Sequence, residues 1–551
     1  MAQAQTPLRA QPTASEFEAD AVFVAWQGDA SIQRCGICHF SPGNQFAKRD
    51  TDFCRLDELE RWLKKDKHAI ARQRIEPIAT DERDQAEARI VRNLAARSGA
   101  TVKLPKNWIG ESNSLSFAMC KRLGYDVQTE EGYASFRTNC LTCHGGYEPA
   151  GGSDGFSPGD AARPGVGCNY CHQIGSDSRW IDEHSGFETK ATWRALPAQA
   201  KAEKGMRDLV SAGAQAQLCY RCHIGDLERG MFVSHAMYAA GHPPLPGVEL
   251  NSLVEAMPRH WRSPGELYQS LKNSPQRSAY FAANYPGISE NAGEAMRVDR
   301  YPWRIDTMLR GALASQQQSL RLTAQAANPS SNHWGDYALY DCAACHHDLH
   351  LPSARQKARQ KAFQPGAPGR PRLHEWPQTL SRAVGTASGE EASLTPLNSR
   401  LLSAVTQRPF GDRAAVAQAA SELHDALEQL QQRVTTKPLT EAFAHDLLSA
   451  LAETPEPLLI DYHAARQIAL AIRCIDADLE QLGKPLPSEL RAAIAKLGIG
   501  TSAASTAVSI DLPGGPDRAI YPDFLKPELE RQANYDPAQF IQQLRRVHAR
   551  P

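Results

Sequence analysis

The stretch Leu218–Pro246, LCYRCHIGDLERGMFVSHAMYAAGHPPLP, combines a cysteine pair with three histidines. It opens with the pattern Cys-x-x-Cys-His, formed by Cys219, Cys222 and His223. In this pattern two thiols can form thioethers to a haem, and the histidine that follows can bind the haem iron. His235 and His242 come next, ahead of a Pro-Pro pair, and are candidates for the second axial ligand. The stretch therefore predicts a covalently attached c-type haem.

The same pattern occurs five times along the chain. The cysteine pairs are Cys35 with Cys38, Cys140 with Cys143, Cys168 with Cys171, Cys219 with Cys222, and Cys342 with Cys345. Each pair is followed at once by a histidine, namely His39, His144, His172, His223 or His346. Histidine is only 18 of the 551 residues, so chance is a poor explanation. We predict five covalent haems, with these histidines as proximal iron ligands.

Other uses of cysteine explain the pattern less well. Zinc ribbons also contain Cys-x-x-Cys, but five pairs leave an odd number of half-sites, and zinc needs no histidine directly after each pair. A thioredoxin-like motif would occur once, near a strand–helix pattern. Of the other cysteines, Cys54 and Cys120 could form a disulfide in an oxidising compartment. Cys474 lies in an apolar, helical stretch, and we expect it to be buried.

Histidines outside the motifs are candidates for the second axial ligands. His68 lies in the segment LDELERWLKKDKHAIAR, whose leucines have helical spacing, and we expect one helix there. His184 follows the third motif, and Trp180, one turn earlier, could pack on a porphyrin. Each could instead be an ordinary surface histidine.

Two further candidates lie near the fourth motif and one before the fifth. We expect a helix over 232–240 that ends at Gly241, which would let His235 and His242, two turns apart, point the same way. Alternatively His242 only caps a helix end. His333 is too near its own motif in sequence, so we expect it to serve a neighbouring haem. We expect His260 to be structural or exposed, and His347 and His350 to be surface or supporting groups.

Composition places the chain among globular proteins, with 42% hydrophobic and 22% charged residues. The formal net charge of -1 gives no indication of nucleic acid or of an anionic membrane surface. No apolar run is long enough to predict a transmembrane segment. No basic leader or apolar signal-peptide core is visible, although Ala-Gln-Ala near the start resembles the residues beside a cleavage site. Because c-type haem attachment normally occurs outside the cytoplasm, we expect a periplasmic or otherwise extracytoplasmic location.

The predicted fold class is mainly α with extensive irregular loops. We expect a flexible tail over 1–16, a pentahaem cytochrome c domain over 17–350, a basic Pro/Gly-rich linker over 351–373, and an α-helical domain over 374–551. Within the last segment, apolar periodicity predicts helices over 413–434, 440–452, 458–482, 488–497 and 536–548. Amphipathic helices joined by short loops are typical of an antiparallel bundle. His424, His445 and His463 on these helices are expected to be satisfied or exposed rather than ligands.

Several segments resemble one known family. They are WLKKDKHA, GVGCNYCH followed by SRWIDEH, GMRDL with CYRCHIGD and SHAMYAAGHPPLP, and YDCAACHHDL. These segments, across about residues 20–350, are similar in kind and order to those of multihaem cytochromes c grouped with the nitrifier tetrahaem cytochrome and the hydroxylamine oxidoreductase superfamily. The helical tail resembles the carboxy-terminal part of longer, largely uncharacterised members. One departure follows the third motif, where QIG stands in place of the family's usual Gly-Pro pair.

The resemblance implies bis-histidine haems and electron transfer along packed porphyrins. It carries the distal-ligand role to His68, His184, His235, His242 and His333. Five proximal and five distal histidines would leave no iron open to substrate, which favours an electron carrier with redox proteins as partners, such as another cytochrome or a quinol-linked membrane complex. An enzyme acting on a small nitrogen or sulfur compound would need one vacant axial position, for example where His333 or His235 does not ligate. A third alternative is a docking module, in which the helical tail binds the partner.

Overall fold

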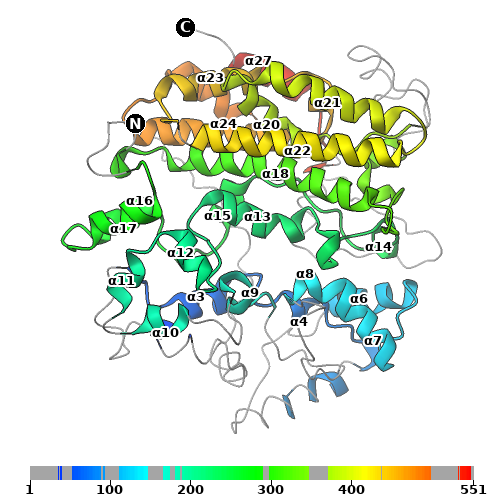
Figure 1. Ribbon diagram of the computed structural model, residues 1–551. Coiled ribbons are helices and arrows are strands. Elements are labelled where there is room, and N and C mark those ends of the chain that lie inside the picture. Colours follow the sequence, from blue (N-terminus) through cyan, green and yellow to red (C-terminus); the bar gives the residue numbers. More distant parts are fainter. Residues whose placement is uncertain are drawn as a thin grey trace, which may run out of the picture. The chain divides into compact units, whose positions relative to one another are not determined.

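The fold is described from a computed structural model. The described residues are 35, 38–39, 53–82, 84–88, 91–92, 111–146, 165–173, 180–186, 189–288, 297–346, 370–435, 437–497, 531–532 and 534–547. The predicted tail over 1–16, most of the predicted linker and the histidines at 347, 350 and 548 lie outside them. Within these ranges the protein is mainly helical (Figure 1), as predicted, and its β pairing is limited to two isolated bridges, Asp226 with Met231 and Tyr340 with Leu373.

The chain divides into two compact units. The first contains the described residues up to Tyr170 together with Met257–Ser263, and the second contains Cys171–Ala256 and the described residues from Pro264 onward. The main helices of the first unit are α3 (Glu58–Lys65), α4 (Ala71–Ile75), α6 (Glu111–Arg122), α7 (Glu130–Phe136) and α8 (Thr142–His144). The short helix α9 (Cys168–His172) contains the point of division.

A small core holds the first unit together around α4, α6 and α7. Its apolar part consists of Cys120, Val127, Tyr133, Phe136 and Leu141. Beside it the hydroxyl of Tyr133 donates to Glu76 Oε1 at 2.9 Å, and the guanidinium of Arg72 donates to the Tyr133 oxygen at 3.3 Å. Arg72 Nε also lies 3.6 Å from Glu76 Oε2, so the buried guanidinium is paired with a carboxylate.

The prediction of a single helix around His68 is wrong. Helix α3 ends at Lys65, Asp66 is extended, and α4 begins only at Ala71. The carboxylate of Asp66 accepts a hydrogen bond from the backbone N–H of His68 at 2.9 Å, so the side chain offers the backbone an alternative to the helix. His68 therefore lies in a turn, which apolar periodicity alone does not distinguish from a helix.

The second unit is larger and contains most of the helices. In chain order they are α10 (Trp180–Ser185), α11 (Lys190–Arg194), α12 (Ala198–Glu203), α13 (Ala212–His223), α14 (His235–Ala240), α15 (Leu250–Ala256), α16 (Pro264–Ser270), α17 (Arg277–Asn284), α18 (Trp303–Ala327), α20 (Trp376–Ala387), α21 (Glu391–Thr406), α22 (Arg413–Thr435), α23 (Glu441–Ala452), α24 (Tyr462–Gln481), α25 (Ser488–Lys496) and α27 (Pro537–Val547).

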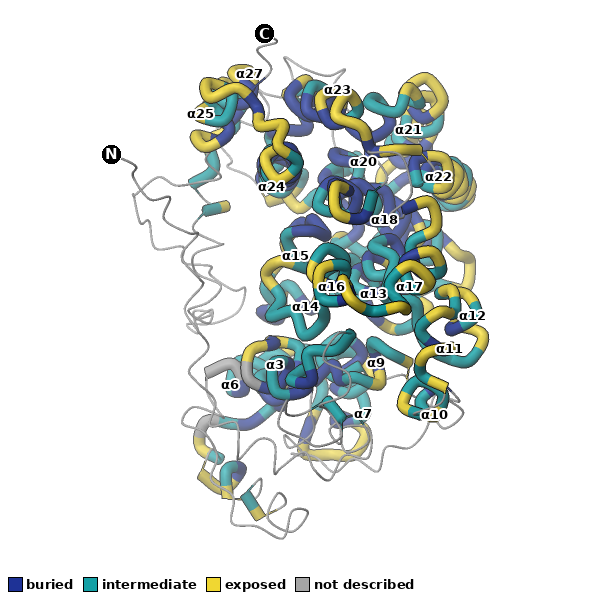
Figure 2. The backbone as a smooth tube through the Cα atoms, turned by 90° about the vertical axis from the view of Figure 1, so that its left-hand side faces the viewer, coloured by how far each residue is buried: buried dark blue, intermediate teal, exposed yellow. Residues whose placement is uncertain are grey.

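Helix α18 is the centre of this unit. It packs along α22 and also contacts α13, α20 and α24 (Figures 1 and 2). Most of its residues are buried, whereas α22 is buried only along one face, formed by Val416, Ala420, Leu423, Leu427, Leu430 and Val434. That face is the one predicted from the sequence. An amphipathic helix beside a helix buried on most sides is the usual arrangement of a helical core.

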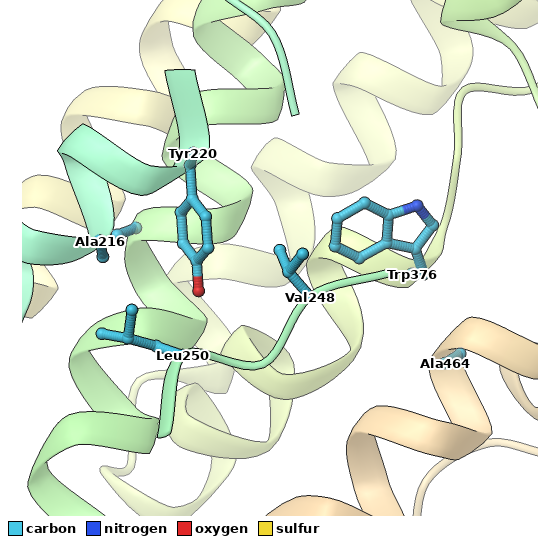
Figure 3. Packing of buried hydrophobic residues seen from close by; sticks show 7 residues of the cluster. Ala216, Tyr220, Val248, Leu250, Trp376 and Ala464 are labelled. Atoms are coloured by element: carbon cyan, nitrogen blue, oxygen red, sulfur yellow. The ribbon is translucent and has the colours of Figure 1, made fainter. Parts of the chain in front are cut away.

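The helix that carries the fourth motif is anchored in this core. Tyr220, between the two cysteines of the motif, is 1% exposed and packs with residues of α18, α20, α24 and the segment before α15 (Figure 3). The cluster consists of Ala216, Tyr220, Val248, Leu250, Ala314, Trp376 and Ala464. The motif therefore stands at the end of α13 on a rigid support.

Most predicted helices of the carboxy-terminal part are confirmed, in α22, α23, α25 and α27. The segment expected as one helix over 458–482 begins with a 3-10 turn, Leu458–Ile460, and α24 follows it. The interruption is Asp461, whose carboxylate caps α24 by accepting from the N–H of His463 at 2.8 Å. Helices α20 and α21 were not predicted.

The predicted domain boundary over 351–373 stays a prediction, since residues 351–369 lie outside the described ranges. The compact units divide elsewhere, because α18 packs with helices that follow that boundary. Among the described helices, none is both long and apolar enough to cross a membrane.

Candidate haem sites

The Cys-x-x-Cys-His motifs lie on helical turns. The third is α9 itself, and the fourth forms the last turn of α13. The second runs from a π-helical turn, Arg137–Leu141, into α8, and the fifth begins a 3-10 turn, Cys342–Ala344. The three described residues of the first, Cys35, Cys38 and His39, are also helical. On a helical turn, positions i, i+3 and i+4 share one face, so both thiols and the imidazole can approach the same planar group.

The cysteines of the motifs form no disulfide bonds in the structure. Burial raises the pKa of Cys219 to about 11, and burial together with nearby thiols raises that of Cys140. These two thiols are therefore protonated at neutral pH. In the described ranges, the groups of three potential metal ligands are His39 with Cys54 and Glu58, and His424 with Asp425 and Glu428, so no two motifs join into a four-ligand zinc site. Cys54 and Cys120 form no disulfide bond with each other in the structure, and Cys474 is buried as expected.

At the fifth motif two histidine rings lie close together. The ring centroids of His235 and His346 are 6.2 Å apart, with 30° between the ring planes. Helix α14 is held there because the N–H of His235 donates to Asp336 Oδ1 at 3.0 Å, and the Tyr337 ring packs edge-on against His235 at 5.2 Å. A metal–imidazole bond is about 2 Å long, so two bonds plus half of each ring place the centroids of an axial pair about 6 Å apart. The centroid separation of His235 and His346 therefore matches that of two imidazoles bound to one iron.

His242 lies past Gly241, the αL residue that ends α14. Since it is off the helix, the two-turn argument that aligned it with His235 is wrong. Its ring lies against Tyr238 at 5.9 Å, and its Nδ1 donates to the carbonyl of Pro243 at 2.7 Å. Burial lowers the pKa of His242, so the imidazole is neutral at neutral pH.

Near the fourth motif, the Sγ of Cys222 lies 3.8 Å from the Sδ of buried Met231. The next residue, Phe232, packs edge-on against His333 at 5.3 Å. The structure thus brings His333 to the segment that follows the fourth motif.

His68 lies beside the third motif. Its carbonyl accepts from the N–H of Val166 at 2.9 Å, and Val166 is two residues before Cys168. The second and third motifs also approach each other, because a Cβ on Gly146, with φ of 61°, would lie 3.1 Å from the side chain of Tyr170.

His184 is tied to the residue after His172. The indole N–H of Trp180 donates to the carbonyl of Gln173 at 3.5 Å, and the rings of Trp180 and His184 are 5.2 Å apart. Trp180 itself is buried against Trp193, with ring centroids at 6.2 Å. Gln173, which opens the QIG departure, has φ of 57°, a left-handed conformation that glycine adopts more easily.

Four predicted ligand histidines share one hydrogen-bonding arrangement. In each, Nδ1 contacts an oxygen that can only accept: Glu58 Oε2 for His39 at 3.1 Å, Asp66 Oδ1 for His68 at 2.9 Å, the Ile181 carbonyl for His184 at 3.1 Å, and the Pro243 carbonyl for His242 at 2.7 Å. Nδ1 must therefore donate, so in a neutral ring the lone pair is on Nε2. Metal-binding histidines show this arrangement almost always.

His463 shows the opposite arrangement, because its Nδ1 accepts from the N–H of Gly247 at 3.1 Å. In a neutral ring this places the proton on Nε2 and removes the ligand lone pair there. The expectation that His463 is a satisfied structural histidine is confirmed.

Two histidines near the motifs were not expected there. His374 donates from Nε2 to the Ala338 carbonyl at 3.2 Å, just before the fifth motif. His260 has Asp66, Glu58 and His39 as electrostatic neighbours and packs against Trp261 at 4.9 Å. Burial nevertheless lowers the pKa of His260, so it is neutral at neutral pH. Neither residue stands near a motif in sequence, so no local pattern could indicate its place.

Comparison of the chain with protein-family profiles, with curated proteins and with solved structures finds no match in any of the three.

Proposed function

We propose that the chain is a pentahaem c-type cytochrome that transfers electrons through bis-histidine haems. The observation that carries the proposal is the spacing of His235 and His346, which fits an axial pair at one of five Cys-x-x-Cys-His motifs. The motifs are helical turns, and His39 of the first motif and three histidines outside the motifs have Nδ1 against an acceptor oxygen, which puts the lone pair of a neutral ring on Nε2. No described group offers the ligand set of a structural zinc site.

When bound, haem supplies a one-electron Fe(III)/Fe(II) couple. The residues of the chain have three tasks toward it. The cysteines attach it, the Nδ1 hydrogen bonds fix the imidazole orientation and tautomer, and buried residues such as Tyr220 and Met231 keep the attachment segments rigid and dry.

The same proposal includes the organisation of the chain. A multihaem cytochrome over 17–350 is followed by a helical bundle from 374, and the proposed relationship is to the multihaem cytochromes of the hydroxylamine oxidoreductase superfamily. The bundle supports the fourth motif through the Tyr220 cluster. An extracytoplasmic location and redox-protein partners follow from the chemistry of c-type haem.

Electron paramagnetic resonance of the oxidised holoprotein at low temperature tests this proposal. We expect low-spin ferric signals for all five haems and no binding of carbon monoxide after reduction, because every iron has two histidine ligands. A high-spin signal that integrates to one haem, with carbon monoxide binding, would instead support the oxidoreductase with an open axial site.

A further inference from the structure

The acceptors at Nδ1 differ between the two units. In the first unit they are carboxylates, Glu58 for His39 and Asp66 for His68. In the second unit they are neutral backbone carbonyls, for His184 and His242. This contrast concerns these four histidines and is independent of how the two units are placed.

The carboxylate of Glu58 is held firmly against His39. Its Oε2 accepts from Nδ1 of His39 at 3.1 Å, and its Oε1 accepts from the backbone N–H of Arg55 at 2.6 Å. The side chain is only 15% exposed, so its charge is weakly screened by water.

A carboxylate at Nδ1 makes the imidazole a stronger donor to a metal bound at Nε2. It also places a negative charge near the iron, which favours the ferric state over the ferrous one and lowers the reduction potential. A backbone carbonyl at Nδ1, as for His184 and His242, contributes a dipole but no charge.

We infer that Glu58 is a positioning residue that makes the haem attached at Cys35 and Cys38 a low-potential centre, below the haems whose ligands donate to backbone carbonyls. Asp66 contacts Nδ1 of His68 in the same way, so it would lower the reduction potential of the haem that His68 binds. Oxidation of the ferrous centre releases one electron to a one-electron acceptor, such as a ferric haem of higher potential in the same chain, and no bond forms or breaks. This inference rests on the proposed function.

The test is a spectroelectrochemical redox titration of the full holoprotein and of E58Q. The amide keeps the shape and an acceptor oxygen for Nδ1 of His39 but removes the charge. We expect the reduction equilibrium constant of one haem to rise about tenfold, which is about 59 mV more positive for a one-electron couple. The other haems should keep their potentials, and E58D, which restores the charge, should return the affected haem toward the original value.

The matched control is D57N. Asp57 is the preceding residue, is similarly shielded at 22% exposed, and pairs with Arg61 rather than with a histidine. An E58Q titration identical to that of the unchanged protein, or an equal shift in D57N, would overturn the inference. Retained low-spin signals in E58Q show that the variant folds and stays ligated. Absence of haem from the unchanged protein would instead refute the proposed function, so the two failures are distinguishable.

Discussion

At the scale of single residues, the proposed ligand His242 and the structural His463 differ in how ring atom Nδ1 is hydrogen-bonded. His242 donates from Nδ1 to a carbonyl, whereas His463 accepts at Nδ1 from a backbone N–H. Both are half-buried, so burial alone does not distinguish them. The direction of the hydrogen bond decides which nitrogen keeps a lone pair.

Replacement of His235 tests the axial pair at the fifth motif. We expect H235A to convert one haem of the five from low to high spin and to let it bind carbon monoxide, because one axial position opens. Ferric resonance spectra and carbon monoxide difference spectra measure this. H463A is the control and should leave all haems low spin, since His463 engages a backbone N–H. Unchanged spectra in H235A would contradict the pairing of His235 with His346.

His374 should make stability depend on pH. Burial lowers its pKa below the ordinary 6.5, against the opposing effects of Asp461 and the Ala338 carbonyl. The unfolded chain therefore binds a proton more readily than the folded one, and stability present above pH 6.5 is lost as pH falls through that value toward the folded pKa. We expect H374Q to lose less thermal stability than the unchanged holoprotein between about pH 7 and about pH 5. Equal losses in both would show that other groups cause the dependence.

At the scale of elements, α18 depends on close approach to its neighbours. A Cβ on Gly311 would lie 2.4 Å from the Cβ of Leu250, near the Tyr220 hydroxyl. We expect G311A to destabilise the second unit by about 1–3 kcal/mol, although alanine normally favours a helix. Thermal or denaturant unfolding of the holoprotein measures this.

The control at this scale is Gly265 in α16, where a Cβ would meet no atom within 4 Å. G265A should leave stability unchanged or raise it by up to about 1 kcal/mol. A G311A protein as stable as G265A would show that α18 and Leu250 are not in the close contact described.

Some helices and helix ends can be predicted from the sequence, and others cannot. The face of α22 follows from apolar spacing, because its pattern repeats over several turns without a competing side chain. The break between α3 and α4 does not, because it depends on one hydrogen bond that the backbone N–H of His68 donates to the carboxylate of Asp66. Helix α21 was missed because Pro396 inside it reads as a helix breaker.

At the scale of the whole molecule, candidate attachment sites can be recognised in the sequence, whereas their surroundings cannot. Each Cys-x-x-Cys-His motif is local, so its residues can be recognised without the fold. Pairing between histidines far apart, such as His235 with His346, needs the tertiary structure, as does the place of His260 and His374. The roles of α18 and the predicted 351–373 boundary belong to this scale too, because sequence order does not reveal which helices share a core.

The most direct test of the central claim is the intact mass of the denatured chain, produced in a host that attaches c-type haem. The account predicts the mass of the polypeptide plus five haems, retained after acid–organic extraction because thioethers do not dissociate. It also predicts that replacing both cysteines of one motif by alanine removes one haem. A denatured mass equal to that of the bare polypeptide would contradict the account.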